Sequence, residues 1–413
     1  MKKIKYLKCI NCGKEFQQQK GLYICDECNN NLEVIYDYDF IKKKISKEKL
    51  KKNNKFDIWR YEPLLPIQDL SNIPPVHIGG SPLYSFPNLA KEFGVKNLYF
   101  KDDGKNPSAS FKDRAGAIAL VNALENKEKV ICGASTGNAA SSMACLTATK
   151  NIKTIIFVPK TAPIAKIAQL LIFGAIVIMV KGTYDDAFDL SIEASKEFGW
   201  YNRNTGYNPF TREGKKTCSL EIAEQLNWEV PDKVFVPIGD GNIISGIWKG
   251  WKDLYGIGFI KKLPQLVGCQ AKFSNAVKKA FDSDGKIRAV SGKTIADSIS
   301  VSVPRDGQAA VKALKESKGF AIEVSDKEIL DSIKEVARKT SIFGEPAGVT
   351  SYAAFKKAVS LKKVSEKDNI VLLITGNGLK DINSAMKCVG QPFLIDPNLK
   401  ALKGLIKKIS IDK

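Results

Sequence analysis

One lysine of this sequence lies in a loop of small residues, just before an apolar helix. The loop is Asn-Pro-Ser-Ala-Ser at residues 106–110, and Phe-Lys-Asp-Arg follows it before the helix expected over residues 115–124. A lysine in this position is partly desolvated, and desolvation favours the neutral amine over the ammonium ion. Because the neutral amine is the form that makes a Schiff base, Lys112 is the first candidate for a covalent role.

Two further turns of small residues each follow an apolar strand and open a helix. Ser-Thr-Gly-Asn at residues 135–138 follows a strand expected over residues 129–132, and Gly-Asp-Gly-Asn-Ile at residues 239–243 follows one over residues 234–237. Such turns point backbone amides at ligands, and the second is suited to hold a phosphate at a helix N-terminus. A lysine, an anion-binding loop for the substrate and a phosphate cup together predict a pyridoxal phosphate site.

These motifs resemble the β-family, or fold type II, of pyridoxal phosphate enzymes, and within it the threonine synthases. The resemblance spans roughly residues 75–385, and six motifs occur in the family's order. They are the Ser-Phe-Lys-Asp-Arg loop, Ser-Thr-Gly-Asn, an Asn-Pro, Glu-Gly and Lys-Thr stretch, the glycine cup, Glu-Pro-Ala-Gly and Thr-Gly-Asn-Gly. The fold implied is α/β, with two doubly wound parallel-sheet domains similar to the β-subunit of tryptophan synthase.

The resemblance also implies a role for each residue of the site. Lys112 is expected to carry the cofactor and to move protons, while Asn138 bonds to the cofactor's ring hydroxyl and Thr375 faces its pyridine nitrogen. The expected contacts of the cofactor phosphate are Gly239, Asp240, Gly241, Asn242 and Ile243. The expected contacts of the substrate carboxylate are Ser135, Thr136 and Gly137, and those of the substrate phosphate are Asn208, Arg212 and Lys215.

Three of these features have plainer interpretations that stay open at this point. Ser135 to Asn138 can be simple helix capping, although capping and ligand binding use the same free amides. The glycine cup can be an ordinary tight turn. Glu345, in a segment that passes near the cofactor ring in relatives, can equally be a carboxylate that matches the dipole at a helix start.

One stretch departs from the family pattern. The family carries an arginine two residues before the Glu-Gly pair, and Thr211 stands there in this chain. The arginine is displaced by one position to Arg212, and Lys215 lies two residues after Glu213. The residues at 79–82 and Ala139 also depart from the usual pattern. These departures concern the substrate and not the cofactor.

The implied activity is that of a threonine synthase-like lyase. Such an enzyme converts O-phosphohomoserine and water to threonine and phosphate by γ-elimination and β-addition. Two other reactions would use the same cofactor: β-replacement on O-phosphoserine, as in a cysteate or cysteine synthase, and dehydration of serine or threonine. A candidate from another class, a nucleic-acid binder built on a disused enzyme fold, is disfavoured because the lysine, the cup and the asparagine are all present.

Four of the nine cysteines form two Cys-x2-Cys pairs near the N-terminus. The spacing of Cys9, Cys12, Cys25 and Cys28 is typical of a zinc ribbon, in which four thiolates hold one tetrahedral ion. A closed set of four leaves no position for substrate, so the zinc would be structural; a metal-free ribbon is the alternative. The remaining five occur in apolar contexts and are expected to be small buried side chains: Cys132, Cys145, Cys218, Cys269 and Cys388.

Strands and helices are expected to alternate from residue 96 onward, which argues for parallel sheets with helices on both faces. The cofactor would then lie beyond the carboxyl ends of the strands. The predicted divisions are a ribbon at residues 1–36, a basic helical linker at 37–58, a smaller domain at 97–212, and a larger domain made of 59–96 with 213–400.

The charge and hydropathy of the chain restrict its partners. The net charge is +20, but the lysines are spread over the whole chain. The one concentration, at residues 42–55, lacks interleaved aromatic residues, so a solvated surface is expected and no nucleic-acid partner. A positive field also attracts anionic substrates. With no apolar run of about 18 residues and no signal peptide, we expect a cytoplasmic protein without a membrane partner. The family resemblance implies a homodimer.

Overall fold

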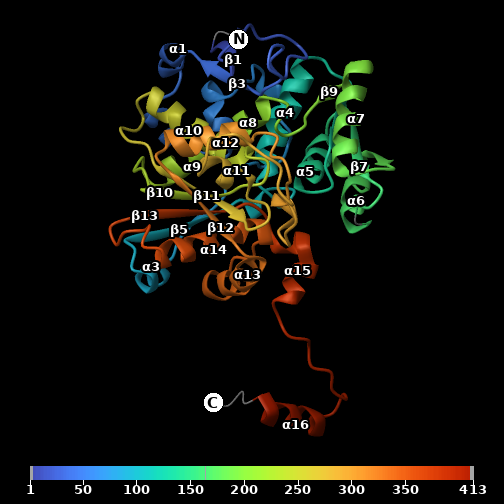
Figure 1. Cartoon of the computed structure of the whole chain (residues 1–413), viewed down its shortest axis with the longest axis vertical. Helices are drawn as coiled ribbons and strands as arrows, with labels where there is room; N and C mark the ends of the chain where they lie inside the picture. Colours follow the sequence, from blue (N-terminus) through green and yellow to red (C-terminus); the bar gives the residue numbers. More distant parts are fainter. Residues whose placement is uncertain (1–2, 163, 410–413) are drawn as a thin grey trace.

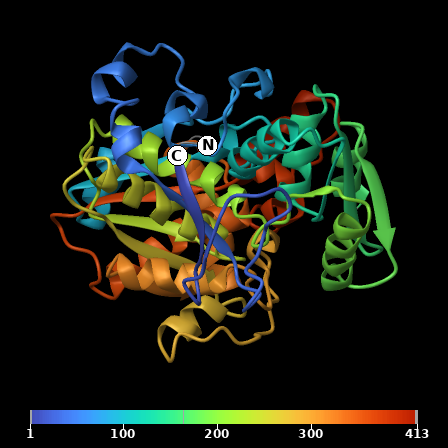
Figure 2. The ribbon, with the colours of Figure 1, turned by 90° about the horizontal axis from the view of Figure 1, so that it is seen from above.

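The computed structural model describes residues 3–162 and 164–409 and contains three sheets. The first is a small antiparallel sheet at the N-terminus with the order β2-β1-β3. Its strands are β1 (Ile4–Cys9), β2 (Glu15–Phe16) and β3 (Leu32–Tyr36). Two short helices, α1 (Tyr38–Lys42) and α2 (Lys47–Lys52), follow it. Viewed from above, this N-terminal part lies over the body of the protein (Figure 2).

The largest sheet has six strands in the order β12-β11-β10-β13-β5-β4, and only the pair β4 and β5 is antiparallel. Its strands are β4 (Leu83–Ser85), β5 (Asn97–Asp102), β10 (Lys233–Pro237), β11 (Gln265–Ala271), β12 (Phe320–Val324) and β13 (Asn369–Ile374). The central strands are buried almost throughout because helices cover both faces.

The helices of this part lie in two layers. On one side of the sheet are α3 (Pro87–Phe93), α13 (Asp326–Thr340) and α14 (Pro346–Ser360), and on the other are α9 (Thr217–Gln225), α10 (Asn242–Gly256) and α12 (Gly307–Glu316) (Figure 1). The remaining helices here are α8 (Phe210–Lys215), α11 (Ala276–Phe281) and α15 (Ile382–Lys387). The two layers bury separate hydrophobic clusters against the sheet.

The third sheet has four parallel strands in the order β8-β7-β6-β9. Its strands are β6 (Val130–Ala134), β7 (Lys153–Pro159), β8 (Ile176–Val180) and β9 (Tyr201–Asn202). Its helices are α4 (Lys112–Glu125), α5 (Asn138–Thr147), α6 (Ile164–Leu171) and α7 (Tyr184–Glu197). This sheet, with α6 and α7, stands to one side of the larger sheet (Figures 1 and 2).

The α/β fold with two parallel sheets, and the predicted alternation of strands and helices, are confirmed. Strand β5 is grouped differently from the sequence-based division, which placed residues 97–212 together. It pairs with β4 and β13 in the six-stranded sheet, because chain order does not decide which strands become neighbours.

Helix α16 (Leu399–Ile409) stands away from the body at the end of an extended segment (Figure 1). Within the described residues, we find no helix of the length and apolarity needed to cross a membrane.

Candidate active site

A cavity of about 340 Å³ lies where strands of the two parallel sheets end. The loops after β6, β10 and β13 all reach it, so the carboxyl ends of strands from both sheets contribute to its wall. Its wall is formed by Lys112, residues 134–139, residues 237 and 239–243, the loop at residues 297–303, and the side chains of Tyr184, Asp185, Thr205, Lys215, Arg305, Glu345, Ala347 and Thr375.

Lys112 is the first residue of α4, and the loop before it is held at several points. The backbone N–H of Phe111 donates to the carbonyl of Thr375 at 2.9 Å, which ties the loop to the end of β13. The amide and hydroxyl of Ser108 both donate to the Asp113 carboxylate, at 2.7 and 2.6 Å. The lysine is therefore carried on a rigid turn between the two sheets.

The surroundings of Lys112 favour its neutral amine. Burial lowers the pKa of Lys112 below its ordinary value of 10.5, and the charge of Arg203 lowers this pKa further. The carboxylates of Glu345 and Asp240 oppose the shift. Burial outweighs these carboxylates. Near neutral pH, the uncharged and nucleophilic fraction of Lys112 is therefore larger than that of a lysine at the surface.

Asn138, the first residue of α5, bonds to the carboxylate of Glu345. Its side-chain nitrogen donates to both carboxylate oxygens at 3.0 Å. Burial raises the pKa of Glu345, and the hydrogen bond from Asn138 and the charge of Lys112 oppose the rise. Gly376 makes room for this carboxylate, since a Cβ there would lie 2.4 Å from Glu345 Oε1. Glu345 and Asn138 thus form one unit beside Lys112.

The turn at residues 239–243 has the backbone of an anion cup at the start of α10. Gly241 has a φ of +90°, and a Cβ at this position would lie 2.6 Å from the carbonyl oxygen of Asp306. Only glycine fits, for both reasons. Within the described chain, the amides of Gly239, Gly241 and Asn242 donate no hydrogen bond, so they are available to a ligand.

Lys215 reaches the cavity beside this cup. Its ammonium donates to the side-chain oxygen of Asn242. Burial lowers the pKa of Lys215 well below its ordinary value, and the charges of Lys112 and Arg203 lower the pKa further. An anion bound beside this amine would raise the pKa of Lys215 again, so that its ammonium form would then be favoured.

The structure brings most of the predicted site residues onto one cavity, but two of them lie elsewhere. Arg212 donates to Asp306 at 2.6 Å, to the carbonyl of Leu32 at 2.9 Å and to Ser245 at 3.1 Å. Asn208 bonds to the backbone of Asn202 and Phe210. Both side chains are buried and neither belongs to the cavity wall. Of the three predicted phosphate contacts, only Lys215 reaches the cavity.

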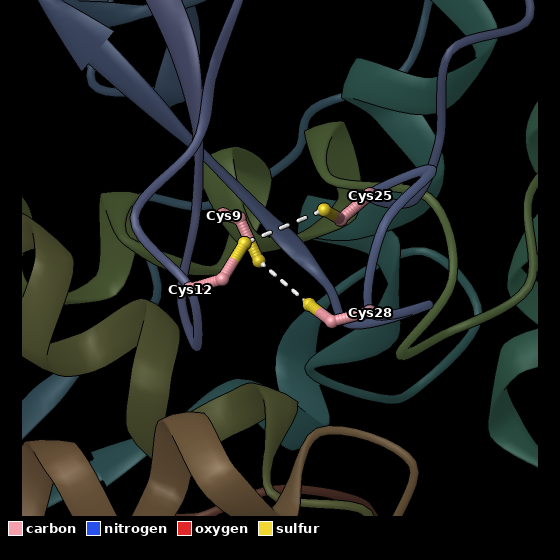
Figure 3. A group of neighbouring side chains, drawn as sticks. All are labelled: Cys9, Cys12, Cys25 and Cys28. Atoms are coloured by element: carbon pink, nitrogen blue, oxygen red, sulfur yellow. Dashed lines mark hydrogen bonds between the residues drawn. The ribbon is translucent and has the colours of Figure 1, made fainter.

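The four N-terminal cysteines come together at the tips of the small antiparallel sheet (Figure 3). Their sulfur atoms all lie within 4.8 Å of one another, with Cys9 Sγ 3.4 Å from Cys28 Sγ and Cys12 Sγ 3.6 Å from Cys25 Sγ. Four thiols on two facing knuckles are the ligand set of a structural zinc ion. The cluster could therefore hold zinc, as its spacing predicted.

Comparisons with known proteins agree with this geometry. A family model described as "Pyridoxal-phosphate dependent enzyme" matches residues 75–376. The chain is 40% identical over 405 residues to a threonine synthase of Methanocaldococcus jannaschii, covering 97% of this chain and 99% of the relative. It is 36% identical to a threonine synthase of Methanosarcina acetivorans, covering 97% of this chain and 98% of the relative.

The chain belongs to the threonine synthase family of pyridoxal phosphate-dependent enzymes. Among solved structures, it is similar to the processed form of threonine deaminase isoform 2 from Solanum lycopersicum. The TM-score is 0.64 at 23% identity, over 75% of this chain and 88% of that one. At this level of identity the likeness concerns the fold alone.

The residues of the cavity fit the cofactor of the threonine synthase family. The cup at residues 239–243 offers free amides at a helix N-terminus, where a side chain on Gly241 would block the space. Lys112 offers an amine beside it, and Thr375 lines the same cavity with a neutral hydroxyl. The donor set thus matches a phosphate at one end and an aldehyde at the other.

Several cavity residues were not predicted from the sequence. Tyr184, Thr205 and Arg305 line the wall, as does the loop at residues 297–303, and Arg203 packs against Gly133 just before the wall residues 134–139. No motif marks these positions. The only signal for Arg203 in the sequence was its place two residues after an aromatic pair, Trp200 and Tyr201, where a short strand can end.

Proposed function

We propose that this chain is a threonine synthase that converts O-phosphohomoserine and water to threonine and phosphate. The observation that carries the proposal is one cavity that combines an amine of lowered pKa, Lys112, with anion-binding groups at several places on its wall. A substrate that carries both a carboxylate and a phosphate, and that reacts beside a cofactor with its own phosphate, calls for such a distribution. The identity to threonine synthases over nearly the whole chain supports this choice of substrate.

Each predicted residue then has a proposed task. Bound pyridoxal phosphate supplies an electron sink that makes the Cα and Cβ protons of the amino acid acidic. The cup at residues 239–243 binds the cofactor phosphate, and Asn138 binds the ring hydroxyl while Glu345 holds its amide in place. Thr375 offers a neutral partner to the pyridine nitrogen, which suits elimination and replacement at the β- and γ-carbons.

The substrate-binding tasks fall to the other turn and to the cations. Ser135, Thr136 and Gly137 at the start of α5 bind the substrate carboxylate, which holds the Cα proton over Lys112. The amine of Lys112 takes that proton and returns protons later in the reaction. Lys215 contributes positive charge near the phosphate groups. Burial raises the pKa of both Asp240 and Glu345, so both add less negative charge to the cavity than surface carboxylates would.

The test is a panel of substrates given to the purified protein loaded with pyridoxal phosphate. We expect O-phosphohomoserine to yield phosphate and threonine in equal amounts, and the Lys112→Ala variant to yield neither. Phosphate release from O-phosphoserine in the presence of sulfide or sulfite would indicate the β-replacement reaction instead. Ammonia and keto acid from serine or threonine alone would indicate a dehydratase. No threonine from O-phosphohomoserine refutes the proposal.

We also propose that the enzyme works in the cytoplasm as a homodimer. The homodimer rests on the family resemblance, and the cytoplasmic location rests on the composition of the chain. Sedimentation velocity of the cofactor-loaded protein tests the first, since a monomer at micromolar concentration contradicts it. Fractionation of the source cells tests the second.

A further inference from the structure

Arg203 is a buried arginine without a partner among the described residues. Its side chain is 2% exposed, and its Nε and Nη2 atoms make no hydrogen bond there. Two other buried arginines of the chain differ in this respect: Arg114 pairs with Asp103 and Glu221, and Arg212 pairs with Asp306. A buried charge without a partner is costly, so proteins rarely keep one that meets no anion.

The local structure holds Arg203 in this costly position. Its backbone N–H donates to the carbonyl of Cys132 at 2.9 Å, which continues the register of β9 beside β6. Its side chain then crosses Gly133, where a Cβ would lie only 3.1 Å from the arginine Cδ. Beyond Gly133 the strand runs into Ala134 and Ser135 of the cavity wall. Gly133, the fourth residue of β6, therefore makes room for the side chain of Arg203 directly behind this part of the wall, which Arg203 itself does not line.

The charge of Arg203 acts on the cavity itself. It lowers the pKa of both Lys112 and Lys215, which line the wall, and it opposes the rise in the pKa of Tyr184 that burial causes. Burial in turn lowers the pKa of Arg203 to about 10. Two residues further on, Thr205 lines the cavity with a buried hydroxyl that has no partner in the described chain. Two lysines and a free hydroxyl therefore line the cavity, and the charge of Arg203 acts on both lysines from behind the wall.

The cofactor phosphate alone does not explain why this cavity has so many cationic and hydroxyl groups in and beside its wall. The cup at residues 239–243 and Lys215, which bonds to Asn242, are sufficient for the cofactor phosphate. Arg203 and Thr205 belong to a different segment, the one that follows β9. Arg305 also lines the wall, but its guanidinium pairs with Asp185 at 2.7 Å. Arg212, the sequence-based candidate, has all its nitrogens engaged in structural bonds.

We infer that Arg203, helped by the hydroxyl of Thr205, binds the phosphate of the substrate. The inference rests on the proposed function and assigns the phosphate-binding guanidinium of this chain, where Thr211 stands in place of the family's arginine. The planar guanidinium donates two parallel hydrogen bonds to a phosphate, a geometry that a lysine does not reproduce. Arg203 therefore selects phosphorylated over unphosphorylated hydroxyamino acids.

The test compares Arg203→Gln and Arg203→Lys with the parent enzyme, all loaded with pyridoxal phosphate so that the cup is filled. In Arg203→Gln we expect KM for O-phosphohomoserine to rise about 100-fold or more, since one partner of a buried charge pair is lost. The KM of Arg203→Lys should lie between that of the parent and that of Arg203→Gln. L-threonine has no phosphate, and its binding is measured from the change in cofactor absorbance. Its dissociation constant should stay within threefold of the parent value in both variants.

Thermal unfolding separates this role from a purely structural one. Without phosphate, we expect the Tm of Arg203→Gln to equal or exceed that of the parent, because a buried unpaired charge is removed. Inorganic phosphate should raise the Tm of the parent and leave that of Arg203→Gln unchanged. As a matched comparison, Arg212→Gln removes a paired guanidinium and should lower the Tm without phosphate.

Three results would overturn the assignment: a KM in Arg203→Gln within threefold of the parent, an equal loss of L-threonine binding, or a phosphate-dependent rise in Tm that survives the substitution. Failure of the proposed function is recognised separately, as a parent enzyme that makes no threonine from O-phosphohomoserine. In that case the phosphate-dependent Tm of the parent and of Arg203→Gln still decides whether Arg203 binds a phosphate.

Discussion

Substitution of Arg114 by methionine should destabilise the protein strongly, because Arg114 is the centre of a buried charge network. Its Nε donates to Asp103 at 2.6 Å, and its Nη1 and Nη2 donate to Glu221 at 2.6 and 2.7 Å. Lys101 donates to the same Glu221 at 2.7 Å. The four side chains are at most 1% exposed, so two cations balance two carboxylates out of contact with water.

The size of the effect follows from the charges left behind. Arg114→Met leaves two buried carboxylates facing one lysine, and breaking a buried pair in this way costs about 3–5 kcal/mol. The pKa of Glu221 leads to a similar figure. Burial alone would raise this pKa, but Arg114 and Lys101 outweigh burial and lower it from 4.5 to about 2. At about 1.4 kcal/mol for each tenfold change, Arg114 and Lys101 together favour the ionised Glu221 by roughly 3 kcal/mol after burial is offset.

The assay is urea unfolding of the parent, Arg114→Met and the double variant Arg114→Met/Glu221→Gln. The double variant restores the balance between Lys101 and Asp103, so it should regain about 1 kcal/mol or more relative to Arg114→Met. Activity should fall too, since Arg114 lies two residues after Lys112 and fixes the first turn of α4 to the end of β5. A loss below about 1 kcal/mol in Arg114→Met, or a double variant less stable than the single one, would refute the reasoning.

Three further predictions concern the lysine, the cup and the cysteine cluster. In the cofactor-free protein, the pKa of Lys112 in the folded state lies below its ordinary value of 10.5. Between the pKa of the folded state and that of the unfolded state, the unfolded state binds more protons, so the free energy of unfolding rises with pH in this range. Lys112→Met should therefore be the more stable protein at pH 7 by urea unfolding, with a difference that narrows towards pH 9.5; a constant difference contradicts the lowered pKa. Gly241→Ala should weaken cofactor binding about tenfold or more, because the positive φ and the contact with Asp306 exclude a side chain; unchanged binding in a spectrophotometric titration would show that the cup does not hold the phosphate. Cys28→Ser should lose bound zinc, measured by elemental analysis, and should bind cofactor more weakly, since Asn31, directly before β3, donates to Asp306 at 2.7 Å and Asp306 in turn accepts from Asn242 of the cup; equal zinc content in variant and parent would exclude the cluster as the metal site.

The residues that the sequence grouped correctly are those whose roles depend on local backbone geometry. The turns at residues 135–138 and 239–243 lie at strand ends before helices, as predicted, because small residues allow a tight turn and Gly241 allows the positive φ that the second turn requires. The two Cys-x2-Cys knuckles likewise come together as their spacing predicted. The roles of these turns and of Lys112 in binding and catalysis stay predictions.

The sequence by itself determined the strand-turn-helix units, the position of the reactive lysine and the four-thiol cluster, because each depends on residues close together in the chain. Only the tertiary structure decided which strands became neighbours and which cations found partners. Strand β5 pairs within the larger sheet, Arg212 forms an ion pair with Asp306, and Arg203 packs against Gly133 behind the cavity wall. These outcomes depend on contacts between distant segments, since a charged side chain is placed by the carboxylates and the space that the whole fold brings to it.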